Sequence, residues 1–412
     1  MNFFARFKKL FLILFFLGLV IFLAWLLWRT FFSSRAPQLA INQTATTSPG
    51  NFPVAGEGDT NVITPGSGGS LQPGANIPTN EGLDNIAVGG LTKTRALNDS
   101  PTLAPTLASD GQAVQYYNPN DGKFYRIDSQ GRAVAISDKV FHNVQKVTWA
   151  PDKNKAILEY PDNSKIFYDF DQKRQVTIPK HWQDFSFSPD SQRLSSKSLG
   201  LDVENRFLVI SDSDGTKAQA LEEIGNNADK VYPSWSPNGQ SVAMFTRGLD
   251  FDRQEVFFVG LNGENFKSTI IEGRGFKSSW SPQGDRLLYS VYSSRDDMNP
   301  SLWLVNAQGE AIGSGRTDLG LNTWANKCTF AGNDKVYCAV PENLPQGAGL
   351  FPELADSTKD DLYVIDLKTG QKKLIAVPES SYNISQIMVS NNQKNLYFTD
   401  KQSQKLYKID LP

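Results

Sequence analysis

The side chains that usually act as nucleophiles, general bases or metal ligands are scarce in this sequence. Its only histidines are His142 and His181, which precede Pro151 and Pro189 by nine and eight residues. These prolines belong to a repeated turn, so the two histidines occupy equivalent loops in neighbouring repeats. A metal-binding or catalytic pair is one interpretation of that spacing. Because no carboxylate with ligand spacing accompanies them, we favour two ordinary loop histidines.

The only two cysteines lie in one stretch, CTFAGNDKVYC, that predicts a β-hairpin. Cys328 and Cys338 are equidistant from Asn333, so a symmetric register would place them opposite each other on one face. In an exported protein such a pair can form a disulfide. The closed loop is short, so the bridge would contribute only about 2–3 kcal/mol. Two buried free thiols are the alternative, and a structural zinc cluster is excluded by the cysteine count.

Other signs of catalysis or cofactor binding are weak. The stretch DSDG at Asp212 is similar to the start of a calcium loop, but the third acidic position and the distal glutamate are missing, so a turn is favoured. No G-x-S-x-G nucleophile elbow occurs. The formal net charge of −2 gives no polyanion-binding field. We therefore expect no catalytic residue, no metal, no cofactor and no nucleic-acid partner.

The elements that must position these residues form a repeat. A turn phrase such as WSPNGQ recurs seven times, at spacings of 38 to 59 residues. Its proline presets φ, its Asp or Asn bonds to nearby backbone, and its glycine accepts positive φ, which suits a tight turn between two strands. We expect the aromatic residue before the proline to wedge between neighbouring repeats. The copies are LASDGQ (Leu107), WAPDKN (Trp149), FSPDSQ (Phe187), WSPNGQ (Trp235), WSPQGD (Trp280), FAGNDK (Phe330) and VSNNQK (Val389).

A second phrase, an apolar strand that runs into a turn, recurs with the same phase. A period of about 40–50 residues built from short strands is typical of a β-propeller. The sequence therefore predicts an all-β fold, a seven-bladed β-propeller over residues 85–412. The seven copies are FYRIDSQG (Phe124), IFYDFDQK (Ile166), FLVISDSDG (Phe207), VFFVGLNG (Val256), LWLVNAQG (Leu302), LYVIDLKTG (Leu362) and LYKIDLP (Leu406).

The last repeat stops after its third strand, so the seventh blade lacks a fourth. Residues 89–98, GGLTKTRALN, resemble the fourth strands elsewhere. We expect this segment to complete the last blade, with residues 93–97 beside residues 406–409. Closing the ring would remove an exposed sheet edge that invites aggregation.

The N-terminal residues differ from the rest of the chain. Residues 10–28 carry no charge and are long enough to span the ~30 Å core of a bilayer as a helix. Arg6, Lys8 and Lys9 precede them, which favours a cytoplasmic N-terminus. We expect residues 1–32 to form a cytoplasmic stub and one transmembrane helix in the plasma (inner) membrane, with the propeller outside the cytoplasm. A cleaved signal peptide is the alternative, but no A-x-A site follows.

Residues 33–84 are rich in Gly, Pro, Ser, Thr and Asn, with Phe52 as their only aromatic residue. Such a composition buries too little apolar surface to offset the entropy of ordering. We expect a disordered linker that tethers the propeller, with ends roughly 40 Å apart on average.

Together the two phrases resemble the TolB-type, WD-like β-propellers of bacterial envelopes, over about residues 90–412. The turns WSPNGQ and WSPQGD and the strand LYVIDLKTG carry the resemblance, and four of the seven turns keep the proline. It implies the propeller fold and, by analogy, binding of a partner in the envelope. The chain departs from that family in its predicted anchor and in having no evident N-terminal α/β domain.

Loop length suggests which face of the propeller is used. Loops between second and third strands are long in four repeats: LGLDVEN (Leu199), RGLDFDRQ (Arg247), SSRDDMNP (Ser293) and PENLPQGAGLFPELADSTKD (Pro341). All should emerge on one face, and apolar residues in a long loop suggest docking to a partner. Packing of the longest loop onto the propeller's own rim is the alternative. The candidate partner-binding residues are Asp250, Asp252, Arg253, Arg295, Asp296, Asp297, Leu350 and Phe351.

These observations favour a protein-binding or scaffolding module over an enzyme. The alternatives are a propeller enzyme that acts on glycans or peptides through channel carboxylates, and a structural component of the cell envelope. Carboxylates with perturbed pKa values would favour the enzyme. An apolar patch on the long-loop face would favour binding to a protein partner or an envelope component.

Overall fold

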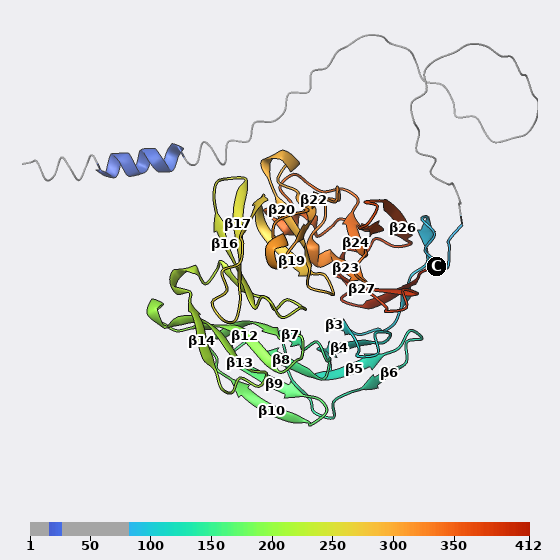
Figure 1. Ribbon diagram of the computed structural model, residues 1–412. Coiled ribbons are helices and arrows are strands. Elements are labelled where there is room, and N and C mark those ends of the chain that lie inside the picture. The colour runs from blue at the N-terminus through green and yellow to red at the C-terminus, as the bar shows by residue number, and fades with distance from the viewer. Residues whose placement is uncertain (1–15, 27–81) are drawn as a thin grey trace, which may run out of the picture. The chain divides into compact units, whose positions relative to one another are not determined.

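The computed structural model describes residues 16–26 and 82–412 of the chain (Figure 1). The chain divides into two compact units, residues 1–74 and 75–412. In the first unit, residues 16–26 form a helix whose residues are all exposed. Residues 10–15 and 27–28 of the predicted membrane span lie outside the described residues, as does the predicted linker as far as residue 81. Over residues 16–26 and 82–412, no helix is long and apolar enough to cross a membrane.

The second unit confirms the predicted all-β, seven-bladed propeller: seven sheets of four antiparallel strands, one with an added parallel strand, are arranged as blades (Figure 1). Blade 1 contains β3 (Leu103–Leu107), β4 (Val114–Asn118), β5 (Lys123–Ile127) and β6 (Ala133–Ala135). Blade 2 contains β7 (Lys146–Trp149), β8 (Lys155–Glu159), β9 (Lys165–Asp169) and β10 (Arg174–Ile178). Blade 3 contains β11 (Trp182–Phe187), β12 (Arg193–Leu199), β13 (Arg206–Asp212) and β14 (Gln219–Glu223).

The remaining blades follow in chain order. Blade 4 contains β15 (Val231–Pro233), β16 (Ala243–Gly248), β17 (Arg253–Val259) and β18 (Thr269–Glu272). Blade 5 contains β19 (Arg274–Trp280), β20 (Arg286–Tyr292), β21 (Pro300–Asn306) and β22 (Thr317–Asp318). Blade 6 contains β23 (Cys328–Ala331), β24 (Lys335–Pro341), β25 (Asp360–Asp366) and β26 (Lys372–Pro378), and blade 7 contains β27 (Ile384–Val389), β28 (Asn395–Asp400) and β29 (Leu406–Asp410). Six 3-10 helices lie in the connections: η1 (Val203–Asn205), η2 (Gly225–Asn227), η3 (Ser294–Asp296), η4 (Gly309–Ala311), η5 (Ala325–Lys327) and η6 (Pro352–Ala355).

The repeated turn has the geometry its residue types predict. In the fourth copy, the Asn238 side-chain oxygen accepts hydrogen bonds from the backbone N–H of Gln240 (3.0 Å) and from the Ser236 hydroxyl (2.7 Å). Gly239 follows with a φ of 75°, which costs glycine nothing because it has no Cβ. The turn that joins the first strand of this blade to the second is therefore held by its own serine and asparagine side chains.

The aromatic residue that precedes the turn lies between blades, as expected. The indole Nε1 of Trp149 in blade 2 donates to the carbonyl of Ala104 in blade 1 at 2.9 Å. Trp280 in blade 5 donates to the Ser234 hydroxyl, beside blade 4, at the same distance. Each indole thus binds a blade to its predecessor through a hydrogen bond as well as through apolar contact.

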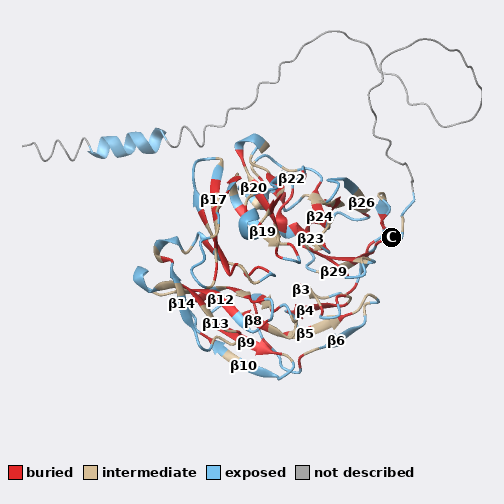
Figure 2. Ribbon diagram, in the orientation of Figure 1, coloured by how far each residue is buried: buried red, intermediate tan, exposed pale blue. Residues whose placement is uncertain are grey.

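The hydrophobic core is divided into clusters, and seven of them each lie between a blade and its neighbour (Figure 2). Strands sandwiched in this way are buried on both faces, as all five residues of β4 show. One cluster joins blade 7 to blade 1 and includes Leu97, Tyr397 and Val114. The ring is therefore closed by the same apolar packing that joins consecutive blades.

The segment before blade 1 completes this closure. In β2 (Arg95–Ala96), Arg95 pairs with Lys408 and Ala96 pairs with Tyr407 of β29, in antiparallel register. The paired region is only two residues long, shorter than the strand expected from the sequence. The residues before β2 make a pairing that the sequence did not predict. The strand β1 (Leu91–Thr92) pairs with β26 of blade 6 as a parallel fifth strand. One short segment therefore connects blades 6 and 7.

Candidate functional site

The two faces of the propeller differ in the loops they carry. One face holds the connections after the first and third strands, of which those after the third strands of blades 4 and 5 are long, at residues 260–268 and 307–316. The other, which we call the long-loop face, holds the loops between second and third strands and those that lead into the next blade. The four loops between second and third strands that the sequence predicted to be long are residues 200–205, 249–252, 293–299 and 342–359, in blades 3 to 6.

Exposed apolar side chains concentrate at the tips of these loops. Leu201 is 98% exposed, Phe251 is 72% exposed and Phe351 is 52% exposed. Single exposed hydrophobic residues are normal on a protein surface, but these occur at equivalent positions in blades 3, 4 and 6. We call the set the apolar rim, and it comprises Leu201, Leu249, Phe251, Leu350, Phe351 and Leu354.

The charged residues predicted in the blade 4 loop hold that loop in place. Asp250 forms an ion pair with Arg253 at 2.6 Å, and this hydrogen-bonded partner lowers the pKa of Asp250. Asp252 accepts hydrogen bonds from the backbone N–H (2.8 Å) and hydroxyl (2.5 Å) of Ser294, which lower its pKa. Because Ser294 belongs to blade 5, Asp252 joins two neighbouring loops of the long-loop face.

The predicted residues of blade 5 connect to their surroundings in a similar way. The Arg295 guanidinium lies over the ring of Trp303, 6.0 Å from its centroid. Asp296 accepts a hydrogen bond from the Ser293 hydroxyl at 3.1 Å. The carbonyl of Asp297 accepts the backbone N–H of Gly347 at 2.9 Å, which ties this loop to the long loop of blade 6.

The sequence left two alternatives for the long loop of blade 6, packing onto the propeller's own rim and exposure for a partner. Different parts of the loop do each. Leu344 packs with Ala348 and Ala355 against Trp324, so this part folds down on the propeller. Leu350 and Phe351, by contrast, are 46% and 52% exposed. The buried part anchors the loop, and the exposed part presents apolar surface to solvent.

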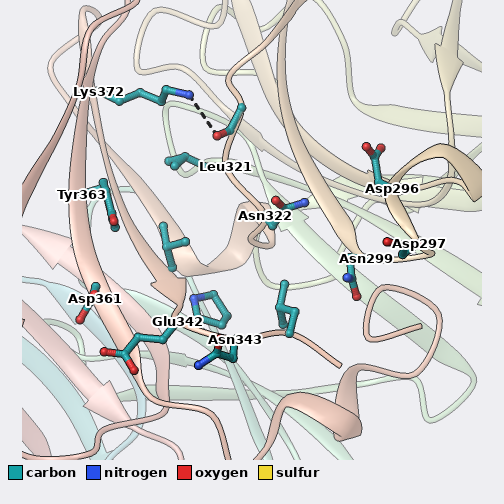
Figure 3. Close-up of a pocket in the computed structure, with 14 residues that line it drawn as sticks. Asp296, Asp297, Asn299, Leu321, Asn322, Glu342, Asn343, Asp361, Tyr363 and Lys372 are labelled. Carbon is teal, nitrogen blue, oxygen red and sulfur yellow. Dashed lines mark hydrogen bonds between the residues drawn. The ribbon is translucent and has the colours of Figure 1, made fainter. Parts of the chain in front are cut away.

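A pocket of about 910 Å³ opens between blades 5 and 6 on this face (Figure 3). Asp296 and Asp297 line it from blade 5, whereas Glu342 and Asp361 line it from blade 6. The single lysine that lines it, Lys372, donates its ammonium group to the carbonyl of Gly320 at 3.1 Å. Three asparagines and a tyrosine complete much of the polar lining: Asn299, Asn322, Asn343 and Tyr363.

Asp361 is the electrostatically unusual group of this pocket. Burial, reinforced by the charge of Glu342, raises its pKa to about 6, although the nearby Lys359 opposes the shift. Lys359 is engaged elsewhere, in an ion pair with Glu342 at 2.5 Å. One carboxylate oxygen of Asp361 is buried without a hydrogen-bond partner in the described structure. A carboxyl with such a pKa can exchange protons near neutral pH.

The two histidines lie where the sequence placed them, in loops that lead into blades 2 and 3, and both are exposed. The backbone carbonyl of His181 accepts the N–H of Leu199 at 2.9 Å. Within the described ranges, no group of three or more His, Cys, Asp or Glu residues could hold a metal ion. No structural feature connects His142 and His181 as a pair.

The two cysteines form a disulfide, Cys328–Cys338, across the first two strands of blade 6. The residues are direct partners in the antiparallel register of β23 and β24. Both are buried in the cluster between blades 5 and 6. The bridge therefore lies in the interior and does not line the large pocket.

No protein-family model and no curated protein sequence matches this chain. Similar solved structures exist, and the two described next share little sequence identity with this chain. An oligogalacturonate lyase from Vibrio parahaemolyticus is 12% identical, with a TM-score of 0.51, over 77% of this chain and 93% of its own. The Cps50 (Swd1) β-propeller domain of Myceliophteria thermophila is 12% identical, with a TM-score of 0.50, over 77% of this chain and all of its own. At such identity the likeness establishes the fold alone.

The sequence indicated the loops of this face, including Asp296 and Asp297 of the pocket lining, but not Asp361 and Tyr363. Tyr363 belongs to the repeated third-strand phrase and Asp361 directly precedes it, and the phrase predicts only the fold. Their one available signal was DDLYVID, which places two acidic residues where the other copies have one or none.

Proposed function

We propose that this chain is a membrane-anchored, extracytoplasmic β-propeller that binds a protein partner through its long-loop face. The observation that carries the proposal is the apolar rim. Apolar side chains exposed together on one face of a monomer mark interaction sites more often than isolated ones do. Aromatic and aliphatic anchors of this kind supply much of the energy of protein–protein association.

The loops that carry the rim are held by contacts to one another, which supports the same proposal. Asp252 bonds to Ser294 across blades 4 and 5, and Asp297 bonds to Gly347 across blades 5 and 6. A surface that is ordered before association loses less conformational entropy when a partner binds. The long-loop face therefore suits recognition of a protein.

The other parts of the chain would have supporting roles. Residues 10–28 would anchor the chain in the plasma (inner) membrane, and residues 33–84 would tether the propeller to that anchor. The resemblance of the repeated phrases to TolB-type, WD-like propellers favours a role in a bacterial envelope. In this arrangement the chain is a scaffold rather than an enzyme.

The test is site-specific photocrosslinking in intact membranes. A photoreactive amino acid replaces Phe251 or Phe351 in the apolar rim, or Val134 as the control. Val134 is equally apolar and 67% exposed, but lies on the outer strand of blade 1. We expect the same partner to crosslink at both rim positions and not at Val134. Crosslinking to nothing, or to the same species at all three positions, would refute docking through this face.

One observation favours a second candidate function, an enzyme acting on glycans. Asp361 has a pKa raised to about 6, and it shares the 910 Å³ pocket with the carboxylate of Glu342. A carboxyl that can be protonated, placed beside a second carboxyl group, can supply the acid and base of glycoside cleavage. The test is an assay for new reducing ends on a panel of neutral and acidic oligosaccharides. Cleavage that is lost in Asp361→Asn but kept in Asp99→Asn would support this function over the scaffold.

A further inference from the structure

A smaller pocket lies near the centre of the long-loop face, apart from the pocket of Figure 3. It has a volume of about 210 Å³ and is lined from blades 5, 6 and 7. Its centre is η5, which contacts both β19 and β27, the first strands of blades 5 and 7. We call it the lysine pocket, because three lysines line it. The lining groups that matter below are Lys277, Asn326, Lys327, Asp356 and Lys401.

Two of the three lysines are paired with carboxylates. Lys327 places its ammonium nitrogen 2.8 Å from both carboxylate oxygens of Asp360, so two of its three N–H groups are used. Lys401 forms an ion pair with Asp356, in the long loop of blade 6. These two positive charges are thus compensated by neighbouring acids.

Lys277 has no such compensation. Among the described residues it makes no ion pair and no side-chain hydrogen bond, although its β19 backbone pairs normally with Ser290. Lys277 is an exposed residue. Partial burial of its ammonium group in the pocket nevertheless lowers its pKa, and the charge of Lys401 lowers it further, with no carboxylate acting in the opposite direction. Three ammonium groups from three blades thus share one small pocket, and one of them is unpaired.

We propose that the lysine pocket binds a small molecule through a carboxylate or phosphate group. Lys277 supplies the unpaired ammonium, while Lys401, the third N–H of Lys327 and the exposed amide of Asn326 supply further donors. Charge-assisted hydrogen bonds to an oxyanion are stronger than neutral ones. An anion would also neutralise the repulsion between Lys277 and Lys401, so its binding gains energy that a neutral ligand cannot.

The neighbouring surface leaves room for the rest of such a molecule. A second hollow of about 260 Å³ shares Ser385 and Lys401 with the lysine pocket. Its lining includes the uncharged polar residues Thr102, Gln386 and Gln404. Asp400 also lines it, and its carboxylate accepts the backbone N–H groups of Asn383 and Ser403. The expected ligand therefore has an anionic head in the lysine pocket and an uncharged polar part beside it. A glycan acid or a sugar phosphate has this chemistry.

The test is calorimetric titration of the full-length chain in detergent with three probes at constant ionic strength. Glucuronate carries a carboxylate, glucose 6-phosphate carries a phosphate, and glucose carries neither. We expect one or both anionic probes to bind, with glucose at least about tenfold weaker. The stronger of the two anions identifies the head group. Equal binding of all three probes, or binding of none, would overturn the proposal.

Substitutions of Lys277 test whether the anionic probe binds in the lysine pocket. Lys277→Gln should weaken the anionic probe about tenfold or more, and Lys277→Arg should restore part of the affinity because it keeps the charge. Lys394→Gln is the matched control, an exposed lysine in a turn of blade 7, and should bind as the unmodified chain does. Circular dichroism and the melting temperature should be unchanged in all three variants. If Lys277→Gln binds the anion as well as Lys394→Gln does, the lysine pocket is not the site.

Discussion

Lys327 and Asp360 form a buried ion pair in which the lysine nitrogen lies 2.8 Å from each carboxylate oxygen. The Asp360 side chain is fully buried, and that of Lys327 is 7% exposed. Asp360 also accepts the backbone N–H of Ile384 at 2.6 Å, which links blade 6 to the first strand of blade 7. Burial lowers the pKa of Lys327 and raises that of Asp360. The pair therefore joins two blades, and removal of either partner leaves the other without compensation.

We predict that Lys327→Met destabilises the propeller by about 3–5 kcal/mol, because it leaves the charge of Asp360 buried and unpaired. The double variant Lys327→Met, Asp360→Leu should recover much of that loss, since no buried charge remains. Urea unfolding of the full chain, followed by tryptophan fluorescence, measures both. Removal of the exposed pair Lys173–Asp138 is the control and should leave the unfolding midpoint nearly unchanged. Equal losses in the single and double variants would show that the pair acts through packing rather than charge.

Asp361 should make stability depend on pH in a defined window. Its pKa rises from 3.8 in the unfolded chain to about 6 in the folded one. The folded state therefore binds the proton of Asp361 more tightly than the unfolded state does. The stabilisation of the fold that results is fully present below pH 3.8 and is lost as pH rises through about 6. Asp361→Asn should match the unmodified chain at pH 3.5 and exceed its stability by about 2 kcal/mol at pH 7.5.

The control for this prediction is Asp162, whose pKa is lowered to about 2 by hydrogen bonds from Ser164 and by Lys180. The pKa shift of Asp162 has the opposite sign, so the ionised form of this carboxylate stabilises the fold. Asp162→Asn should therefore be less stable than the unmodified chain above pH 4. Urea midpoints at the two pH values measure both variants. A gain for Asp361→Asn of the same size at pH 3.5 would mean that ionisation of Asp361 is not the cause.

The disulfide between Cys328 and Cys338 should contribute about 3 kcal/mol, the value expected for so short a loop. Reduction of the unmodified chain should lower the urea midpoint by the corresponding amount. The double variant Cys328→Ala, Cys338→Ala should lose somewhat more, because both sulfurs are buried. A chain whose midpoint is insensitive to reductant would contradict a stabilising role for the bridge.

Closure of the ring should depend more on Leu97 than on the strand β1. Leu97 is 6% exposed in the cluster between blades 7 and 1, and its N–H donates to the carbonyl of Leu406 at 2.9 Å. Leu97→Ala should cost about 2–4 kcal/mol and speed amide hydrogen exchange in β29. Leu91→Ala in β1 is the matched control, since Leu91 is 43% exposed, and should change stability by less than about 0.5 kcal/mol. Unaltered exchange in β29 of Leu97→Ala would show that the ring does not close through this residue.

The sequence alone contained the architecture, because a propeller is built from local units. Each turn such as that at Trp235 needs only its own serine, asparagine and glycine to form, and each hairpin follows from the alternation beside it. The number of blades is then a count of repeats. The opposition of Cys328 and Cys338 is likewise local, since a hairpin register pairs residues equidistant from its turn.

The pockets could not be predicted in the same way, because their walls come from different blades. Lys277 and Lys401 meet only after the ring has closed, and nothing in the sequence near either residue indicates the other. The raised pKa of Asp361 depends on its burial in the folded chain, reinforced by Glu342. The pairing of β1 with blade 6 rather than blade 7 depends on where closure brings that segment. Local chemistry determined the blades, whereas packing between blades determined the surfaces on which a ligand or partner would bind.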